Sequence, residues 1–369
     1  MKWVLVFTLL FTLALYGAQP PHPAHPPHPV HPREPQNPGE TPNLSNPAAV
    51  QNALAALSGP ELLGLARTLP PASQKALVAA LAPTIGTVGA LPTMNTQSQL
   101  QLAGAILTGQ LDSGAAGGWT AASGGESQPK GASYKSGVFT IGWTHPVTKH
   151  FFVGAASGYA HTWSSSLAVN SGYGALYAAY YTHGWYAYEA VLGGGQRFTA
   201  TRNGILGSAE GEGKGFSFGQ LTSTGYNWTL GPWKTGPFAT LSYSLSTTGA
   251  FTETDALPLH IESNTNQSIS TELGWKNTLK LKRVSINADF AWIHEYAKSA
   301  VPSVVSIVGL PASSTTVFGP ALSHDGMVID AGLSFQLSKA LSIGTSYHGE
   351  LLRQNYKANA VIASLKLEF

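Results

Sequence analysis

The sequence predicts an all-β transmembrane protein, an antiparallel up-and-down β-barrel of about 12 strands with an α-helix in its lumen. Three observations indicate this fold. Charged residues make up 10% of the 369 residues, against roughly 25% in an ordinary soluble domain, while aromatic residues also reach 10%. Beyond residue 18 no apolar run is long enough for a membrane-spanning helix, so the chain can span a bilayer only as a closed barrel. From about residue 116 onward, apolar and polar side chains alternate with a period of two.

The composition also excludes several classes of function. A formal net charge of +2 is too small to indicate a nucleic-acid partner. The absence of cysteine excludes disulfide bonds, thiolate catalysis and cysteine-ligated zinc. A chain without cysteine is compatible with passage through an oxidising periplasm.

The first 18 residues predict a secretory signal peptide, because Lys2 precedes a short apolar stretch that ends near Ala18. We expect cleavage after Ala18, which assigns residues 1–18 to the signal peptide. Residues 19–47 are dominated by proline and histidine and cannot build a core. This composition predicts a Pro/His-rich disordered linker or exposed arm.

Four histidines of this linker recur at every third position: His22, His25, His28 and His31. On a polyproline II helix all four would lie on one edge, each about 9 Å from the next. Because this distance is wide for two rings that share one ion, a solvated semi-rigid spacer is favoured over a metal site.

Two helical regions precede the barrel. Residues 48–92 predict a small helical region, with helices over 48–57, from about Ser58 to Leu69, and from about Pro71 to Leu81. A further helix is expected over Gln97 to Leu111, within residues 93–112, and it has no charge before Asp112. It would span roughly 22 Å, close to the ~25 Å apolar band of an outer-membrane barrel, which predicts a luminal helix. Its apolar face would carry Leu100, Ala103, Leu107 and Leu111.

Residues 113–369 are predicted to form the barrel domain. Val361, Leu365 and Leu367 alternate with polar residues in the last segment, and the same two-faced pattern recurs in the other segments. One face is apolar and aromatic, and the other is polar with occasional charges. Strands are expected near 116–123, 131–144, 150–164, 169–182, 184–201, 214–230, 236–247, 265–280, 283–297, 324–337, 340–351 and 357–369.

The links between these strands favour a membrane barrel over a soluble β-sandwich, whose strands also alternate. Short links, near 145–149, 183, 231–235, 281–282 and 338–339, alternate with long loops expected at 202–213, 248–264 and 298–323. Outer-membrane barrels have short periplasmic turns, long external loops and an even strand number. The first strand would therefore begin, and the last strand end, on the periplasmic side.

Over residues 95–369 the sequence resembles a known family, the C-terminal β-barrel domain of autotransporters, which are bacterial outer-membrane proteins of type V secretion. The most specific motifs are Gly236-Pro237-Phe238, the segment Gly249 to Thr254, Glu272-Leu273-Gly274-Trp275 and Trp292-Ile293-His294-Glu295-Tyr296, which is similar to the family's Trp-x-His-Glu strand. The chain also ends on a phenylalanine, Phe369, as the family does.

The resemblance implies a twelve-stranded barrel in outer-membrane lipid, a helix through its lumen, and export of an N-terminal passenger. It also implies recognition by periplasmic chaperones and the barrel-assembly machinery, with the assembly signal at Leu365, Leu367 and Phe369. Most members carry a long β-helical passenger. Here only about 75 residues separate the signal peptide from the predicted luminal helix, and no repeat is visible in them.

Charged residues on the polar faces of the strands predict a luminal polar network around the helix rather than a catalytic dyad. Its expected members are Glu189, Glu272, Arg283, Asp289, Glu295, Asp330 and Glu350. Ser217 stands in a nucleophile-elbow pattern, but the strand, sharp turn and helix that this motif requires are not expected there. His294 and Glu295 do not match a zinc-protease motif. We therefore predict no enzyme, no cofactor and no metal site.

The leading functional hypothesis is a translocator of the outer membrane that exports or displays its own short N-terminal region, the cargo, at the cell surface. A diffusion porin or structural barrel is the alternative, and it would show an open pore without a luminal helix. An outer-membrane hydrolase is a third hypothesis. It would need a convergent acid, base or nucleophile near the external rim.

Overall fold

The computed structural model describes residues 59–78, 103–104, 106–107, 116–129, 133–204, 207–254, 257–296, 300–319 and 323–368. The predicted signal peptide, the Pro/His-rich linker with its four histidines, and Phe369 lie outside the described residues. No helix among the described residues is long and apolar enough to cross a bilayer.

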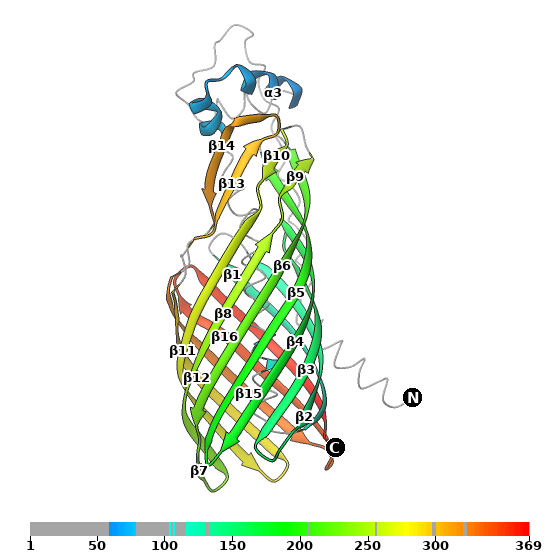
Figure 1. Cartoon of the computed structure of the whole chain (residues 1–369), viewed down its shortest axis with the longest axis vertical. Coiled ribbons are helices and arrows are strands. Elements are labelled where there is room, and N and C mark those ends of the chain that lie inside the picture. Colours follow the sequence, from blue (N-terminus) through cyan, green and yellow to red (C-terminus); the bar gives the residue numbers. More distant parts are fainter. Residues whose placement is uncertain are drawn as a thin grey trace, which may run out of the picture.

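Twelve antiparallel strands form a closed barrel (Figure 1), which confirms the predicted fold class. Each strand pairs with the next barrel strand along the chain, and pairing of the first strand with the last closes the sheet. The barrel strands are β1 (Gly117–Pro129), β2 (Tyr134–Pro146), β3 (Phe151–Trp163), β4 (Leu167–Thr182), β5 (Trp185–Gly204), β6 (Gly207–Tyr226), β8 (Trp233–Thr248), β11 (Asn264–Leu281), β12 (Val284–Glu295), β15 (Asp325–Gln336), β16 (Leu341–Arg353) and β17 (Tyr356–Leu367).

One end of the barrel, here called the short-turn end, carries tight connections and the C-terminus (Figure 1). His183 and Gly184 connect β4 to β5 with φ angles of 48° and 88°. Two-residue turns with positive φ at both positions match the twist of antiparallel strands, which explains so short a link. The short strand β7 (Trp228–Leu230) pairs with β8 at the same end.

The opposite end, here called the long-hairpin end, differs from the prediction of long loops. Residues 202–213 continue the β5–β6 ladder as far as the Gly204–Gly207 pair. Residues 248–264 contain β9 (Phe251–Thr254) and β10 (Leu259–Ile261), and residues 298–323 contain β13 (Pro302–Ile307) and β14 (Leu310–Phe318). Pairing of β10 with β13 joins these segments into a sheet that extends beyond the barrel.

The outer face of the barrel carries an apolar belt, as a lipid-facing surface requires. Its exposed side chains include Ile141, Leu176, Leu241, Leu273, Phe290 and Val361. Near the short-turn end Trp185, Tyr226, Trp228 and Trp275 form a row of ring contacts, with centroids 5.1, 5.3 and 5.7 Å apart. Aromatic rows of this kind lie at the membrane–water interface of such barrels.

The described N-terminal helices lie beyond the long-hairpin end. Helix α3 (Gly59–Thr68) is followed by helical residues 71–78, and both lie next to β13 and β14 (Figure 1).

Candidate functional site in the lumen and at the long-hairpin end

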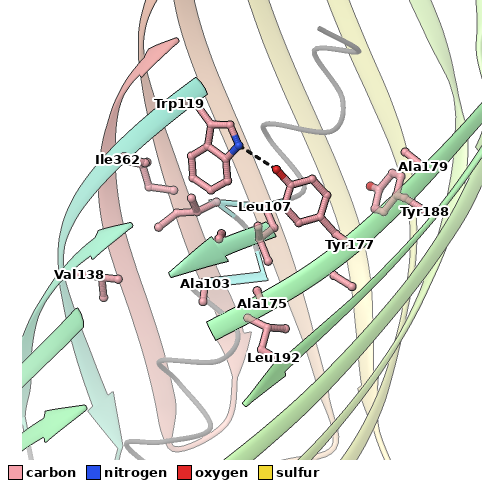
Figure 2. Close-up of a cluster of buried hydrophobic side chains, with 14 of the residues drawn as sticks. Ala103, Leu107, Trp119, Val138, Ala175, Tyr177, Ala179, Tyr188, Leu192 and Ile362 are labelled. Atoms are coloured by element: carbon pink, nitrogen blue, oxygen red, sulfur yellow. Dashed lines mark hydrogen bonds between the residues drawn. The ribbon is translucent and has the colours of Figure 1, made fainter. Parts of the chain in front are cut away.

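One half of the inner barrel wall is apolar and packs against a helical segment. Ala103, Gly104, Ile106 and Leu107 are helical, and the three side chains among them are at most 2% exposed. They share one buried cluster with inward side chains of β1, β2, β4, β5 and β17 (Figure 2): Trp119, Val138, Ala175, Tyr177, Tyr188, Leu192 and Ile362. A Cβ added to Gly104 would lie 3.2 Å from Leu221 Cδ1, so the helical backbone approaches the wall closely. The rest of the predicted luminal helix, residues 93–112, lies outside the described residues.

Tyr177 anchors this apolar wall through hydrogen bonds. Its hydroxyl accepts from Trp119 Nε1 at 2.9 Å and donates to the carbonyl oxygen of Trp143 at 3.0 Å. Thr144 Oγ1 lies 2.9 Å from the same hydroxyl. Because the polar atoms of both rings have partners, the aromatic surface can be buried against the helix at little cost.

The facing half of the wall, on β11, β12, β15 and β16, carries most of the charged inward side chains, beside a small apolar cluster of Ala291, Ile293 and Val328. Five residues of the predicted luminal network project from it inward: Glu272, Asp289, Glu295, Asp330 and Glu350. Arg353 Nη1 donates to Glu350 Oε1 at 2.7 Å, and Ser268 Oγ donates to Glu295 Oε2 at 2.5 Å. Arg353 Nη2 lies 4.0 Å from Glu295 Oε2, so one guanidinium lies between two carboxylates.

The prediction missed three further inward residues. His348 Nδ1 lies 2.8 Å from Asp330 Oδ1. Lys276 Nζ donates to Tyr188 Oη at 3.0 Å and lies 5.0 Å from the Phe238 ring centroid. Its four-residue spacing from Glu272 on one strand was a usable signal, because such residues share a face. Arg353 is the last residue of β16 and comes after a register shift that begins at Glu350, so alternation does not predict which face it occupies.

Two predicted network residues lie elsewhere. Glu189 pairs across β5 and β6 with Thr222, on the outer face of the barrel. Its carboxylate accepts from Gln220 Nε2 at 2.7 Å and from Thr222 Oγ1. The luminal prediction for Glu189 is wrong because the buried tyrosines of β5, Tyr186 and Tyr188, occupy the inner face. Arg283 is also misplaced by the prediction, since it is exposed in the turn between β11 and β12.

The long-hairpin end contains a second buried core, which includes the N-terminal helices. Ala66 and Val78 are 1% and 0% exposed, and Leu63 and Leu77 pack against the same cluster. Leu257, in the link between β9 and β10, belongs to the same cluster. The strands contribute Phe198, Phe251, Leu259, Ile261, Val305, Ile307, Leu310 and Val317. This end of the protein is therefore a folded unit built from helices and extended hairpins.

A buried ion pair lies in the same region and joins β5 to β9. Arg202 Nε lies 3.1 Å from both carboxylate oxygens of Glu253, and Nη2 lies 2.8 Å from Oε2. The side chains are 1% and 2% exposed. Bidentate geometry of this kind is the arrangement that compensates best for burying two charges.

Ser217, His294 and Glu295 do not form a catalytic arrangement with one another. Ser217 lies within β6, and its Oγ donates to the carbonyl oxygen of Gly194 at 3.4 Å, so no nucleophile elbow surrounds it. His294 and Glu295 project to opposite faces. His294 contacts Asp325 outside, at 2.9 Å, while Glu295 is buried inside. Among the described residues, no group of three or more His, Asp or Glu side chains could hold a metal ion.

Comparison with known proteins agrees with this architecture. The family model for the autotransporter beta-domain matches residues 113–348. The translocator domain of autotransporter NalP from Neisseria meningitidis is similar with a TM-score of 0.62 and 14% identity, over 76% of this chain and 99% of that one. The beta domain of the Bordetella autotransporter Brka gives a TM-score of 0.55 and 15% identity, over 69% of this chain and 100% of that one. At these identities the similarity concerns the fold. A search of curated proteins finds no match.

Proposed function

The chain belongs to the autotransporter β-domain family, and from this premise we propose that its barrel exports its own short N-terminal region and displays it at the cell surface. Membership implies an outer-membrane location and a transport role for the barrel. The proposal concerns the cargo, residues 19 to about 92, and the side of the membrane on which it lies.

The path of the chain through the barrel is the observation that carries the proposal. The first strand begins at the short-turn end, where Gly118 pairs with Leu367. Residues 103–104 and 106–107 lie earlier in the chain, are helical and pack against the inner wall. Residues 59–78 lie earlier still and pack at the long-hairpin end. In chain order, the described residues therefore lie first at the long-hairpin end, then against the inner wall and then at the start of the barrel, which supports a path through the lumen.

Orientation follows from the general architecture of outer-membrane barrels, in which short turns face the periplasm and longer segments face outward. On that basis the long-hairpin end is external, and so are the helices bound there. The Pro/His-rich linker precedes them and would extend from the surface as a spacer, up to about 90 Å if it forms a polyproline II helix.

Assembly of this barrel would use the partners that other outer-membrane barrels use. Leu365 and Leu367 alternate on the outer face of β17, opposite Ile343 and Leu341 of β16. We propose that these residues, with Phe369, form the signal read by the barrel-assembly machinery after periplasmic chaperones deliver the chain.

An epitope tag after Glu34 tests the proposal, probed with antibody on intact cells. We expect binding without permeabilisation. A second variant with the tag at Gly231, in the turn between β7 and β8, should bind antibody only after permeabilisation, and a periplasmic protein controls for leakage. Detection of the Glu34 tag only in permeabilised cells would instead favour a barrel with a periplasmic extension.

A further inference from the structure

We propose that the hairpins at the long-hairpin end are a receptor for the chain's own exported helices, and that they hold residues 59–78 without help from the covalent link through the lumen. This inference rests on the proposed function, because it assumes that the helices are external. It adds the identity of their binding partner, which is the translocator itself.

The helices present one apolar face to the hairpins. Leu63 and Ala66 are three residues apart and so share a face of α3, while Leu77 and Val78 are the last described residues of the second helical stretch. All four belong to or pack against the buried cluster at the long-hairpin end, to which β10, β13 and β14 contribute six side chains. The contact extends to the hairpin turn, where a Cβ added to Gly309 would lie 3.9 Å from Arg67 Nη2.

A side chain between the helices fixes them as one unit. Gln74 Nε2 donates to the carbonyl oxygens of Ala66 and Leu69, at 3.1 and 3.0 Å, and Gln74 is 6% exposed. These carbonyls lie at the C-terminal end of α3, where no further helical turn supplies donors. The two stretches therefore bind the hairpins as one surface.

Helix α3 is too short to be stable alone, and Gln74 ties the second helical stretch to it. Helix α3 has 10 residues, and isolated helices below about 12–15 residues are marginal in water. Their fold must depend on the hairpins that bury their apolar face. The dependence links folding to binding, so helices that leave the hairpins would unfold rather than persist free in solution.

The hairpin surface, by contrast, has its own internal supports. The Arg202–Glu253 ion pair joins β5 to β9, and β10 pairs with both β9 and β13. In the β13–β14 hairpin, Ser313 Oγ donates to the carbonyl oxygen of Leu310 at 2.6 Å and accepts from Ile307 N at 2.8 Å. A preorganised surface loses little conformational freedom when the helices bind.

The test separates covalent from non-covalent attachment in the full-length chain. A recognition site for a specific protease is inserted between Gly89 and Ala90, the chain carries an epitope tag after Glu34, and the protease is added to intact cells. We expect the cut, tagged fragment to stay with the cells and to leave them in urea. Release by the cut alone would overturn the proposal.

Matched variants identify the contact that holds the fragment. Ala66→Asp with Val78→Asp places two charges in the buried contact, and we expect release of most of the fragment after the cut. Gly64→Asp with Lys75→Asp adds the same side chains at exposed positions, and we expect retention as in the parent. Equal retention by both pairs would contradict the assigned interface. A chain cut only after permeabilisation would instead contradict the proposed function, which keeps the two failures distinct.

A crosslink gives a second readout if the inserted site resists the protease. The chain has no cysteine, so Arg67→Cys with Val308→Cys supplies a unique pair beside the β13–β14 turn. A bis-maleimide should join the two positions, detected as a linked peptide by mass spectrometry. Arg67→Cys with Leu230→Cys, at the short-turn end, should give no linked peptide. Absence of the Arg67–Val308 product would also overturn the proposal.

Discussion

Glu189 lies on β5, and its carboxylate is on the lipid-facing side of the barrel beside Thr222 of β6. It lies four residues beyond Trp185, about 10 Å along the barrel axis from the aromatic row at the short-turn end. Gln220 and Thr222 each donate one hydrogen bond to its carboxylate. The outer face nearby also carries the exposed apolar side chain of Leu176 on β4. An ionisable group at such a depth is costly in a bilayer.

We therefore predict that Glu189→Leu keeps or raises the urea concentration at which the barrel unfolds in lipid vesicles. Glu189→Lys should lower stability by roughly 2–4 kcal/mol if the site lies near the midplane, and by less toward the interface. Unfolding of the two variants, followed by tryptophan fluorescence, checks both directions. A marked loss of stability in Glu189→Leu would show that the carboxylate has a structural partner that the hydrogen bonds above do not explain.

Arg202 and Glu253 give a second prediction at the scale of single residues. Glu253→Ala leaves a buried, unpaired guanidinium, so it should destabilise the long-hairpin end by roughly 3–5 kcal/mol. The double variant Arg202→Met with Glu253→Leu removes both charges and should lose much less. Limited proteolysis of the hairpins is the measurement, and equal susceptibility of the single and double variants would contradict this account.

Single residues also show where sequence reasoning stops. A period of two identifies which side chains share a face but not which face is inside. On β11 and β12 the aromatic side chains point outward, and the inward assignment of Glu272 and Asp289 follows. On β5 two aromatic side chains point inward instead, because Tyr186 and Tyr188 line the lumen near Lys276. Glu189 alternates with these tyrosines and therefore points outward. The contact between the tyrosines and Lys276 joins distant strands, so the local sequence pattern does not predict it.

Among the larger elements, the luminal helix governs the pore. Removal of residues 93–112 would take Ala103, Ile106 and Leu107 away from the apolar wall. We predict a larger ion conductance for this variant in planar bilayers, because a barrel of about 12 strands has room for one helix. Removal of residues 19–47 should leave the conductance unchanged. Equal conductance of the parent protein and both deletion variants would favour a porin.

The last strand is the element on which assembly should depend. Replacement of Leu367 and Phe369 with serine should lower the outer-membrane yield more than lost apolar burial, at roughly 25 cal/mol per Å², would explain. The comparison is between insertion in cells and spontaneous folding into vesicles of the purified chain. Normal insertion in cells would limit these residues to packing.

The elements differ in how far the sequence could predict them. The twelve barrel strands were predictable because each is long enough to show alternation, as in β11 and β12. The short strands β9 and β10, with four and three residues, carry too few alternations to be distinguished from loops. β10 pairs with β13, and β9 pairs with β10 and β6. Because the β10–β13 and β6–β9 pairings join segments distant in sequence, the external core could not be predicted.

In the whole molecule, the described segments before the barrel are arranged in chain order from the long-hairpin end toward the short-turn end. The N-terminal helices pack at the long-hairpin end, the helical residues 103–104 and 106–107 lie against the inner wall, and the last strand ends at the short-turn end. The described helical residues pack against the large apolar cluster of the inner wall, and most of the charged inward side chains lie on the facing strands.

Labelling of single cysteines on intact cells tests this threading most directly. Gly64→Cys lies on the exposed side of α3, where a Cβ meets no atom within 4 Å, and Leu230→Cys is 59% exposed at the short-turn end. The chain has no other cysteine. With a membrane-impermeant maleimide, we expect labelling at position 64 on intact cells and at position 230 only after permeabilisation. The reverse pattern, with position 230 accessible and position 64 protected, would contradict the direction of threading on which the proposed function depends.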